Sequence, residues 1–157
     1  MATIFIGTDH GGFELKNQLI SWLGTTGYDV EDCGAFELDP EDDYPDYALT
    51  VAENVTADDS EESKGIVICR SSAGVVIAAN KVVGVRAANC VTPDLARKAR
   101  QHNDLNVLGL GADELTFEQA QAIVAAFLET EFSQDERHVR RLGKIATYEV
   151  GEELQTE

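Results

Sequence analysis

The sequence predicts an α/β fold in which a five-stranded parallel sheet carries helices on both faces, giving three layers. Two observations predict it. Short apolar runs alternate with segments of helical periodicity five times along the 157 residues, and this alternation is typical of a doubly wound parallel sheet. The central run, Ile66–Ile68, is continuously apolar, as expected for a strand buried on both faces. The length suffices for one domain with its own core.

Each element follows from a local pattern of residues. Apolar residues recur at helical spacing after the first strand, and Thr92–Pro93 and Thr116 are typical helix starts. The expected strands are residues 3–7, 28–33, 66–69, 85–90 and 106–110. The expected helices are residues 13–23, 44–55, 74–81, 93–101, 116–128 and 133–146, the last of them strongly basic.

The expected topology is Rossmann-like or flavodoxin-like, with strand order 2-1-3-4-5 and a basic helix at the C-terminal end. In such sheets, ligands bind beyond the carboxyl ends of the strands, near the point where the winding changes direction. We expect residues 1–148 to form a single domain and residues 149–157 to form a flexible acidic tail.

Charge is distributed unevenly along the chain. The net charge is −17; residues 1–63 contain 16 acids and one base, whereas residues 64–157 contain 13 acids and 11 bases. So acidic a chain is not expected to bind nucleic acid. Because the overall charge repels anions, any anion site must be local and must come mainly from the second half.

The three cysteines are odd in number, widely spaced and without metal-ligand spacing. They are typical of reduced thiols in a cytoplasmic protein, and we expect no bound metal. No run of about 18 apolar residues is present, so no membrane span is expected. The N-terminal segment enters a strand pattern directly and does not resemble a signal peptide.

Cys69 ends the central strand and is followed by a small-residue turn and an apolar helix beginning at Gly74. Backbone N–H groups at a helix start attract negative charge, and a thiol there is biased toward the thiolate. We therefore expect this strand, turn and helix to hold an anion beside a base or nucleophile. Cys33 and Cys90 also end strands, but no such turn follows them, and we expect both to be core residues.

Asp9 and His10 lie in a glycine-flanked turn at the exit of the first strand. If the first and third strands are neighbours, this turn faces the Cys69 loop across the ligand-binding edge. An Asp–His pair at this edge favours a functional role over that of a solvated turn.

His102 precedes the fifth strand and therefore lies at the amino edge of the sheet, away from Cys69 of the same chain. A five-residue strand spans about 17 Å. If His102 takes part in catalysis, it must reach the site of a neighbouring subunit. This implies a homodimer with shared active sites, or a tetramer built from such dimers.

Cations crowd the C-terminal helix. Arg137, Arg141 and Lys144 are spaced to lie on one helical face, near His138 and Arg140. Because arginine offers two-pronged donors, this face is predicted to bind phosphate.

Taken together, these segments resemble one known family. The matching segments are residues 7–16, 43–48, 65–69, 77–81, 99–108 and 137–141. They are collinear and extend over about residues 3–147. On these segments the chain is similar to the family of ribose-5-phosphate isomerase B and galactose-6-phosphate isomerase, which act on sugar phosphates.

The resemblance implies aldose–ketose isomerisation of a phosphorylated sugar, in the first place ribose 5-phosphate to ribulose 5-phosphate in the pentose phosphate pathway, with no metal or organic cofactor. It implies that Cys69 moves a proton between C1 and C2 through an enediolate and that His102 assists ring opening. The other implied contacts are Asp9 and His10 with sugar hydroxyls or the ring oxygen, Asn103 and residues 70–74 with the developing oxyanion, and Arg137 and Arg141 with the phosphate.

The chain departs from the family pattern at two places. The family's loop after the cysteine is Gly, Ser or Thr, Gly, a variable residue and Gly, whereas this chain has Arg70-Ser71-Ser72-Ala73-Gly74. Two glycines are thus replaced where backbone should approach the substrate. A phosphate-binding arginine of the family, after the fifth strand, is replaced by Asp113. Residues 70–74 and Asp113 are all included in the expected substrate site.

Three interpretations remain open. The chain is an active isomerase in which Arg70 supplies the lost positive charge, or it acts on a six-carbon or weakly phosphate-dependent sugar. In the third interpretation, Arg70, Ser72 and Asp113 leave a binding or regulatory subunit without catalysis. Flavodoxin-like and nucleotide-binding modules share the sheet, but residues 7–12 are not a Gly-x-Gly-x-x-Gly motif. A response regulator needs an aspartate where Cys69 stands.

Overall fold

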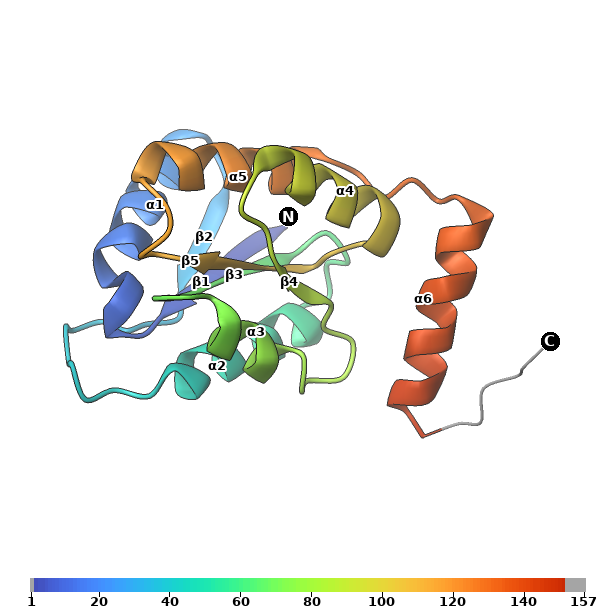
Figure 1. The fold of residues 1–157 in the computed structure, drawn as a ribbon, viewed down its shortest axis with the longest axis horizontal. Helices are drawn as coiled ribbons and strands as arrows, with labels where there is room; N and C mark the ends of the chain where they lie inside the picture. Colours follow the sequence, from blue (N-terminus) through green and yellow to red (C-terminus); the bar gives the residue numbers. More distant parts are fainter. Residues whose placement is uncertain (1, 152–157) are drawn as a thin grey trace.

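The computed structural model describes residues 2–151 and contains a five-stranded, all-parallel sheet flanked by helices (Figure 1). The strands are β1 Thr3–Thr8, β2 Asp29–Asp32, β3 Lys64–Cys69, β4 Ala87–Asn89 and β5 Val107–Gly111. The helices are α1 Phe13–Thr25, α2 Tyr44–Ala57, α3 Ala73–Ala79, α4 Pro93–Asn103, α5 Phe117–Glu129 and α6 Glu136–Glu149, with a 3₁₀ turn at His10–Gly12. The predicted α/β class is confirmed. Most of the expected acidic tail lies outside the described residues.

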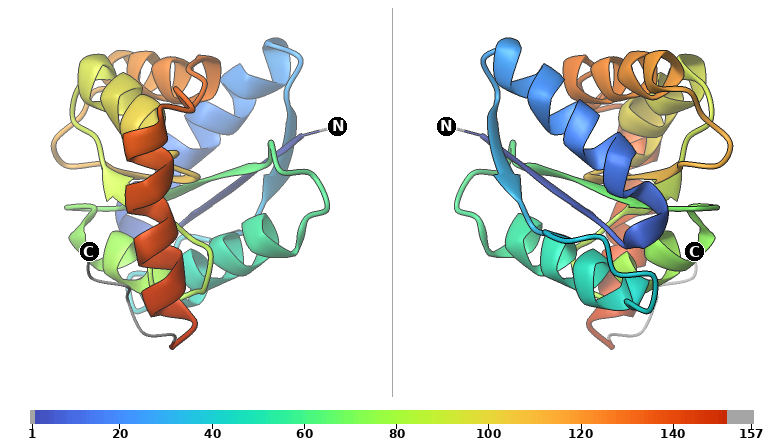
Figure 2. Two further views of the ribbon diagram at one scale, coloured as in Figure 1. Left: turned by 90° about the vertical axis from the view of Figure 1, so that its right-hand side faces the viewer. Right: turned by 90° about the vertical axis from the view of Figure 1, so that its left-hand side faces the viewer.

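Helices cover both faces of the sheet. Figures 1 and 2 show α1, α4 and α5 on one face and α2 and α3 on the other. The core is correspondingly divided into two apolar clusters, one on each face of the sheet. Leu19 and Phe127 are fully buried in the first cluster, and Val51 and Val75 in the second. Burial on both faces explains why the central strands are continuously apolar.

Threonine side chains cap two of the helices, as the sequence predicts. Thr92 Oγ1 accepts a hydrogen bond from the backbone N–H of Leu95, and Thr116 Oγ1 accepts one from Gln119, each at 3.2 Å. The Gln119 side chain in turn accepts from the Thr116 N–H at 2.9 Å, which completes a capping box. These local bonds determine where α4 and α5 begin.

The strand order differs from the prediction in its last two positions, because it is 2-1-3-5-4 instead of 2-1-3-4-5. Every residue of β5 is buried, whereas β4 has only three residues and is partly exposed. A buried apolar strand is favoured inside a sheet, and a short exposed strand is suited to its edge. The order of elements along the chain does not distinguish these two arrangements. The loop that leaves β5 is thereby placed next to Cys69.

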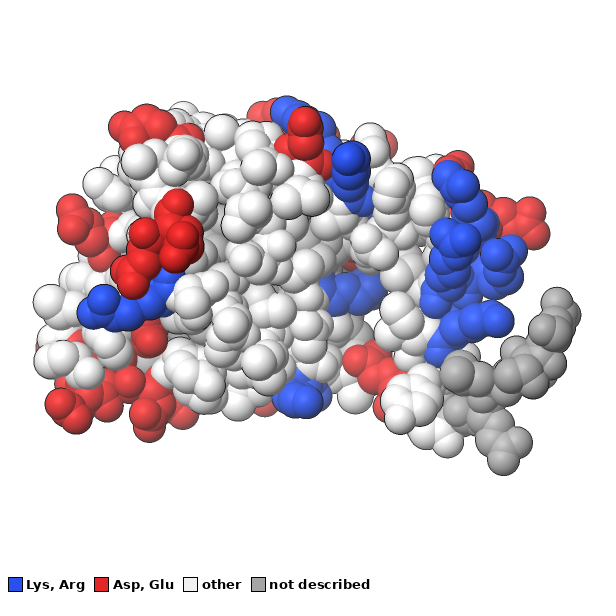
Figure 3. Space-filling model, in the orientation of Figure 1, with Lys and Arg blue, Asp and Glu red and all other residues white. Residues whose placement is uncertain are grey.

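Helix α6 lies at one end of the molecule, apart from the main body (Figures 1 and 2). Its contacts with other elements are chiefly with α4. The predicted basic character is confirmed, since Arg137, Arg140, Arg141 and Lys144 are all exposed. Figure 3 shows Lys and Arg gathered over α6, with acidic groups at the opposite end of that view. Within residues 2–151, no helix is long and apolar enough to cross a membrane.

Candidate active site

The carboxyl ends of β1, β3 and β5 lie side by side. The register pairs Ile68 with Thr8 and Cys69 with Gly111. Beyond the strand ends, the N–H of Ala112 donates to the carbonyl of Cys69 at 2.9 Å, so that the loops are hydrogen-bonded to each other. The candidate residues at this edge, together called the thiol half-site, are Asp9, His10, Asp42, residues 69–74 and Asp113.

Cys69 ends β3 at the predicted position, and its exposed fraction is only 6%. The helix that follows, α3, begins at Ala73 and has seven residues. At Gly74 an added Cβ would lie 2.6 Å from the ring of Tyr44. A residue without a side chain is therefore needed for that ring to pack over the start of α3. Tyr44 thus lies beside the loop after Cys69, a neighbour that sequence reasoning missed.

Asp9 and His10 are held by different partners. Asp9 is buried, and its Oδ1 accepts from the N–H of Gly11 at 2.9 Å. Burial raises the pKa of Asp9, and the bond from Gly11 opposes this rise. His10 Nδ1 lies 2.7 Å from Asp42 Oδ1, and its backbone N–H donates to the same oxygen at 3.0 Å. The side-chain hydrogen bond to Asp42 is the main cause that raises the pKa of His10.

Asp42 is a site residue that sequence reasoning missed. It lies between Glu41 and Asp43 in an acidic loop, where no pattern separates it from its neighbours. Ligand atoms of Asp9, His10 and Asp42 lie within 4.8 Å of one another, as those of a metal site can. Here, however, the His10 nitrogen and one Asp42 oxygen already satisfy each other through their hydrogen bond.

Arg70 and Asp113, which both depart from the family pattern, lie opposite each other. Arg70 Nη1 is 3.7 Å from Asp113 Oδ2, with the two side chains 65% and 54% exposed. The N–H of Asp113 also donates to the carbonyl of Arg70 at 3.1 Å. An added Cβ at Gly11 would lie 2.6 Å from Arg70 Cγ, so the arginine stem crosses the turn after β1. Arg70 and Asp113 can meet in this way only because β3 and β5 are neighbours in the sheet.

Ser72 has a backbone conformation that favours glycine. Its φ angle is 73°, in the left-handed region. Its hydroxyl is buried and, within residues 2–151, has no hydrogen-bond partner. An added Cβ at Gly109 would lie 2.6 Å from Ser72 Oγ, so the glycine in β5 provides the space for this hydroxyl. The replacement of glycine by serine at position 72, noted in the sequence, therefore places a serine in a left-handed conformation and buries its hydroxyl.

Replacing Ser72 with glycine is expected to stabilise the fold by about 1 kcal/mol, or about 3 °C in Tm. The change removes both the left-handed strain and the unpartnered buried hydroxyl, and these gains exceed the added entropy of the unfolded chain. Urea denaturation measures the difference. Ser71→Gly is the matched control, because Ser71 is exposed and has no positive φ. A Ser72→Gly protein no more stable than Ser71→Gly would contradict this account.

A second group of candidate residues lies where α4 meets α6. His102 and Asn103 occupy the last turn of α4, which extends beyond its predicted end near residue 101. The His102 ring stacks on His138 of α6, with ring centroids 4.6 Å apart and an interplanar angle of 17°. Burial, followed by the charge of Arg137, lowers the pKa of His138. The histidine–arginine half-site comprises His102, Asn103, Arg137, His138 and Arg141.

A single chain does not bring the two half-sites together. Cys69 lies at the carboxyl end of β3, whereas α4 leads into the amino end of the parallel strand β5. His102 is therefore at the opposite edge of the sheet from the thiol, as the sequence predicts. Arg137 and Arg141 lie on α6, at the end of the molecule (Figure 1).

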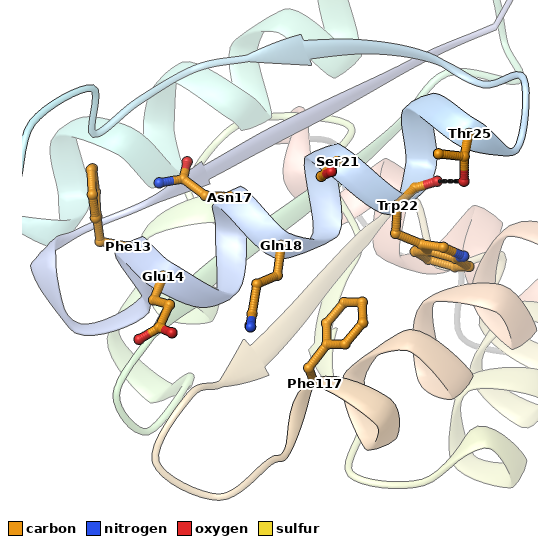
Figure 4. Close-up of a pocket in the computed structure, with 8 residues that line it drawn as sticks. All are labelled: Phe13, Glu14, Asn17, Gln18, Ser21, Trp22, Thr25 and Phe117. Atoms are coloured by element: carbon orange, nitrogen blue, oxygen red, sulfur yellow. Dashed lines mark hydrogen bonds between the residues drawn. The ribbon is translucent and has the colours of Figure 1, made fainter.

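A surface recess between α1 and the start of α5 contains none of the candidate residues (Figure 4). Phe117 reaches from α5 toward Gln18 and Trp22 of α1. Of the residues that line this recess, only Glu14 carries a charge. The recess has hydroxyl groups of Ser21 and Thr25 but no cluster of titratable groups, so the candidate active site is the edge that holds Cys69.

The chain is similar to known proteins along nearly its whole length. Residues 4–145 match the family described as Ribose/Galactose Isomerase. Ribose-5-phosphate isomerase B of Mycolicibacterium paratuberculosis is 43% identical over 146 residues, which cover 93% of this chain and 91% of that protein.

Solved structures agree with the comparison of sequences. Ribose-5-phosphate isomerase B of Clostridium thermocellum has a TM-score of 0.89 at 43% identity, covering 94% of this chain and 97% of that one. The enzyme of Mycoplasma genitalium with bound ribulose 5-phosphate has a TM-score of 0.89 at 42% identity, covering 95% and 97%. The match takes in both half-sites. This chain therefore belongs to the ribose/galactose isomerase family.

Proposed function

We propose that this protein is a cytoplasmic enzyme that interconverts ribose 5-phosphate and ribulose 5-phosphate, a step of the pentose phosphate pathway. One observation carries the proposal: a buried thiol, Cys69, ends the middle strand of the sheet beside the Asp9–His10 turn. Aldose–ketose isomerisation moves protons, so a positioned base and hydrogen-bonding groups are sufficient for it. The similar proteins named above are ribose-5-phosphate isomerases, and one of them holds ribulose 5-phosphate.

In the proposed mechanism, Cys69 is the base. Its thiolate takes the proton from C2 of the open-chain aldose, and the electron pair of that C–H bond forms the C1=C2 bond of an enediolate, with negative charge on O1. The thiol returns the proton to C1 as the O2 hydroxyl loses its proton and becomes the ketone carbonyl; O1 gains a proton. Backbone N–H groups of the loop of residues 70–74 stabilise the oxyanion. Asp9 and His10 hold sugar hydroxyls or the ring oxygen.

We further propose a homodimer in which the histidine–arginine half-site of one subunit completes the thiol half-site of the other. The separation of the half-sites within one chain supports this arrangement, as does the position of α6 apart from the body. In the completed site, His102 assists ring opening and Asn103 adds to the oxyanion contacts. Arg137 and Arg141 bind the phosphate through two-pronged hydrogen bonds.

Arg70 is proposed to replace the arginine that the family carries at position 113. Its guanidinium lies near enough to Asp113 to compensate that carboxylate. Its positive charge also acts on Asp9 and His10, where it opposes the rise in both of their pKa values. The cation is thereby kept at the edge of the thiol half-site, although it comes from a different loop.

Replacing Arg70 with glycine is expected to raise KM for ribose 5-phosphate about tenfold, with a smaller change in kcat. Asp113→Asn is expected to lower KM, because it removes a repulsive charge and frees Arg70. Steady-state kinetics at low and high salt measure both effects, which salt should weaken. Arg97→Ala is the control, since Arg97 is exposed on α4 and paired with Asp94. An unchanged KM in Arg70→Gly would contradict the assigned role.

The proposed activity is tested by measuring ketose formation from ribose 5-phosphate, from six-carbon sugar phosphates and from free sugars. Ribose 5-phosphate is expected to give the highest kcat/KM. A preference for a six-carbon substrate, or for a free sugar, would support the second interpretation of the altered loop. Binding of sugar phosphates without turnover of any of them would support a binding subunit and overturn the enzyme proposal.

A further inference from the structure

Asp42 makes two hydrogen bonds to the same residue of the thiol half-site. Its Oδ1 accepts from the backbone N–H of His10 at 3.0 Å and lies 2.7 Å from His10 Nδ1. The Asp42 side chain is only 6% exposed, whereas that of His10 is 25% exposed. The Asp42 carboxylate is thus almost completely buried, whereas part of the imidazole that it contacts remains exposed.

The second oxygen of Asp42 is buried and has no hydrogen-bond partner within residues 2–151. An unpaired buried carboxylate oxygen disfavours folding, and such an arrangement in a native protein calls for a functional explanation. The bonds of Oδ1 to His10 give a reason to keep a carboxylate here despite this cost, because a carboxylate beside Nδ1 determines both the orientation and the protonation of the ring.

The start of the loop that carries Asp42 is anchored to β1. The N–H of Thr8 donates to the carbonyl of Gly34, and the N–H of Ala35 donates to the carbonyl of Thr8, both at 2.8 Å. Lys16 is fully buried and donates to the carbonyl of Ala35 at 2.6 Å and to Asp32 at 2.7 Å. The loop therefore leaves β2 in a defined position beside the turn that holds His10.

We propose that Asp42 is a positioning residue for the isomerase reaction, which fixes His10 with Nδ1 bonded to Asp42 and Nε2 directed to the sugar. The proposal rests on the function proposed above. With Nδ1–H committed to Asp42, protonated His10 presents Nε2–H as a donor to a sugar hydroxyl or to the ring oxygen. Without Asp42, the ring is free to rotate and to exchange tautomers.

The charged groups around His10 define the expected pH dependence. Asp42 and Asp9 favour the protonated ring, whereas Arg70 and partial burial oppose it; the bond to Asp42 is the largest influence on the pKa of His10. Tyr47 is also close enough to Asp42 to be affected by it: burial, followed by the Asp42 carboxylate, raises the pKa of this phenol, which therefore stays neutral near pH 7. Removing the charge of Asp42 should consequently shift the ionisation of His10 to lower pH.

The experiment compares Asp42→Asn and Asp42→Ala with wild type and with Glu41→Gln, which removes an exposed charge from the same loop. Asn keeps an acceptor for both bonds to His10 and loses only the charge. We expect kcat to fall about tenfold in Asp42→Asn and about 100-fold in Asp42→Ala, with little change in KM. The limb of the pH profile assigned to His10 should move to lower pH in Asp42→Asn, and Glu41→Gln should match wild type.

Two further measurements separate positioning from a general loss of structure. NMR titration of His10 should give a lower midpoint in Asp42→Asn, whether or not the protein turns over ribose 5-phosphate. In a His10→Asn background, Asp42→Ala should have little additional effect on kcat, because the two residues act as one unit. An unchanged His10 titration, or fully additive losses in the double variant, would overturn the proposal; absence of wild-type turnover would instead overturn the proposed function.

Discussion

Replacing Cys69 with alanine is expected to lower kcat for ribose 5-phosphate by about 10³-fold, since a positioned general base contributes on this scale. The thiol ends the middle strand, between the turn after β1 and the loop after β5. Alanine offers no base at this position, and Asp9 and His10 follow a different strand, β1. KM should change little, because the contacts with hydroxyls and phosphate remain.

Ketose formation measures the loss, and exchange of the C2 hydrogen of the substrate with deuterated water measures the proton-transfer step itself. Both should fall together in Cys69→Ala. Cys90→Ala is the matched control: Cys90 is 2% exposed, and burial raises the pKa of its thiol to about 11. This second buried cysteine lies outside the thiol half-site, so its variant should retain kcat. If the C2 hydrogen exchanged in Cys69→Ala at the wild-type rate, Cys69 would be excluded as the base.

Mixing two inactive variants, Cys69→Ala and His102→Ala, is expected to restore activity to about a quarter of the wild-type level. In a dimer with shared sites, each mixed dimer contains one site with both native residues and one with neither. Random exchange gives about half mixed dimers, and one of the two sites in each of these is intact. The physical basis is the position of His102 at the opposite edge of its own sheet from Cys69.

The control for this experiment pairs Cys69→Ala with Asp9→Asn. Both changes lie in the thiol half-site, so every site of the mixed dimer lacks one of these residues and no activity should return. Subunits are exchanged under mild denaturation, and dimer formation is followed by light scattering. Recovery in the control pair, or none with His102→Ala, would exclude the shared site. A measured monomer with wild-type activity would do so as well.

In the altered loop after Cys69, the sequence reveals the substitution, but only the structure reveals its effect on the backbone. The sequence shows that a serine stands where glycine is expected at position 72. Only the structure shows that the backbone keeps the conformation of a glycine there, and that the hydroxyl fills space beside Gly109. The loop thus retains its path, and we expect the serine at this position to lower the stability of the fold.

The sequence by itself determined the α/β class, the positions of most elements and the place of Cys69 and Asp9–His10 at the carboxyl edge. These follow from local patterns: apolar runs produce buried strands, Thr92 and Thr116 cap helices through neighbouring residues, and the residue after a parallel strand always lies at that edge. The separation of His102 from Cys69 follows from the same rule.

Only the tertiary structure decided the strand order and the pairs that depend on it. Strand β5 lies beside β3 because it can be buried completely, and this brings Asp113 to Arg70. Asp42 meets His10 because a loop anchored at β1 returns to the same edge. These contacts join residues far apart in the chain and depend on competing burial of whole strands, so neither periodicity nor spacing specifies them.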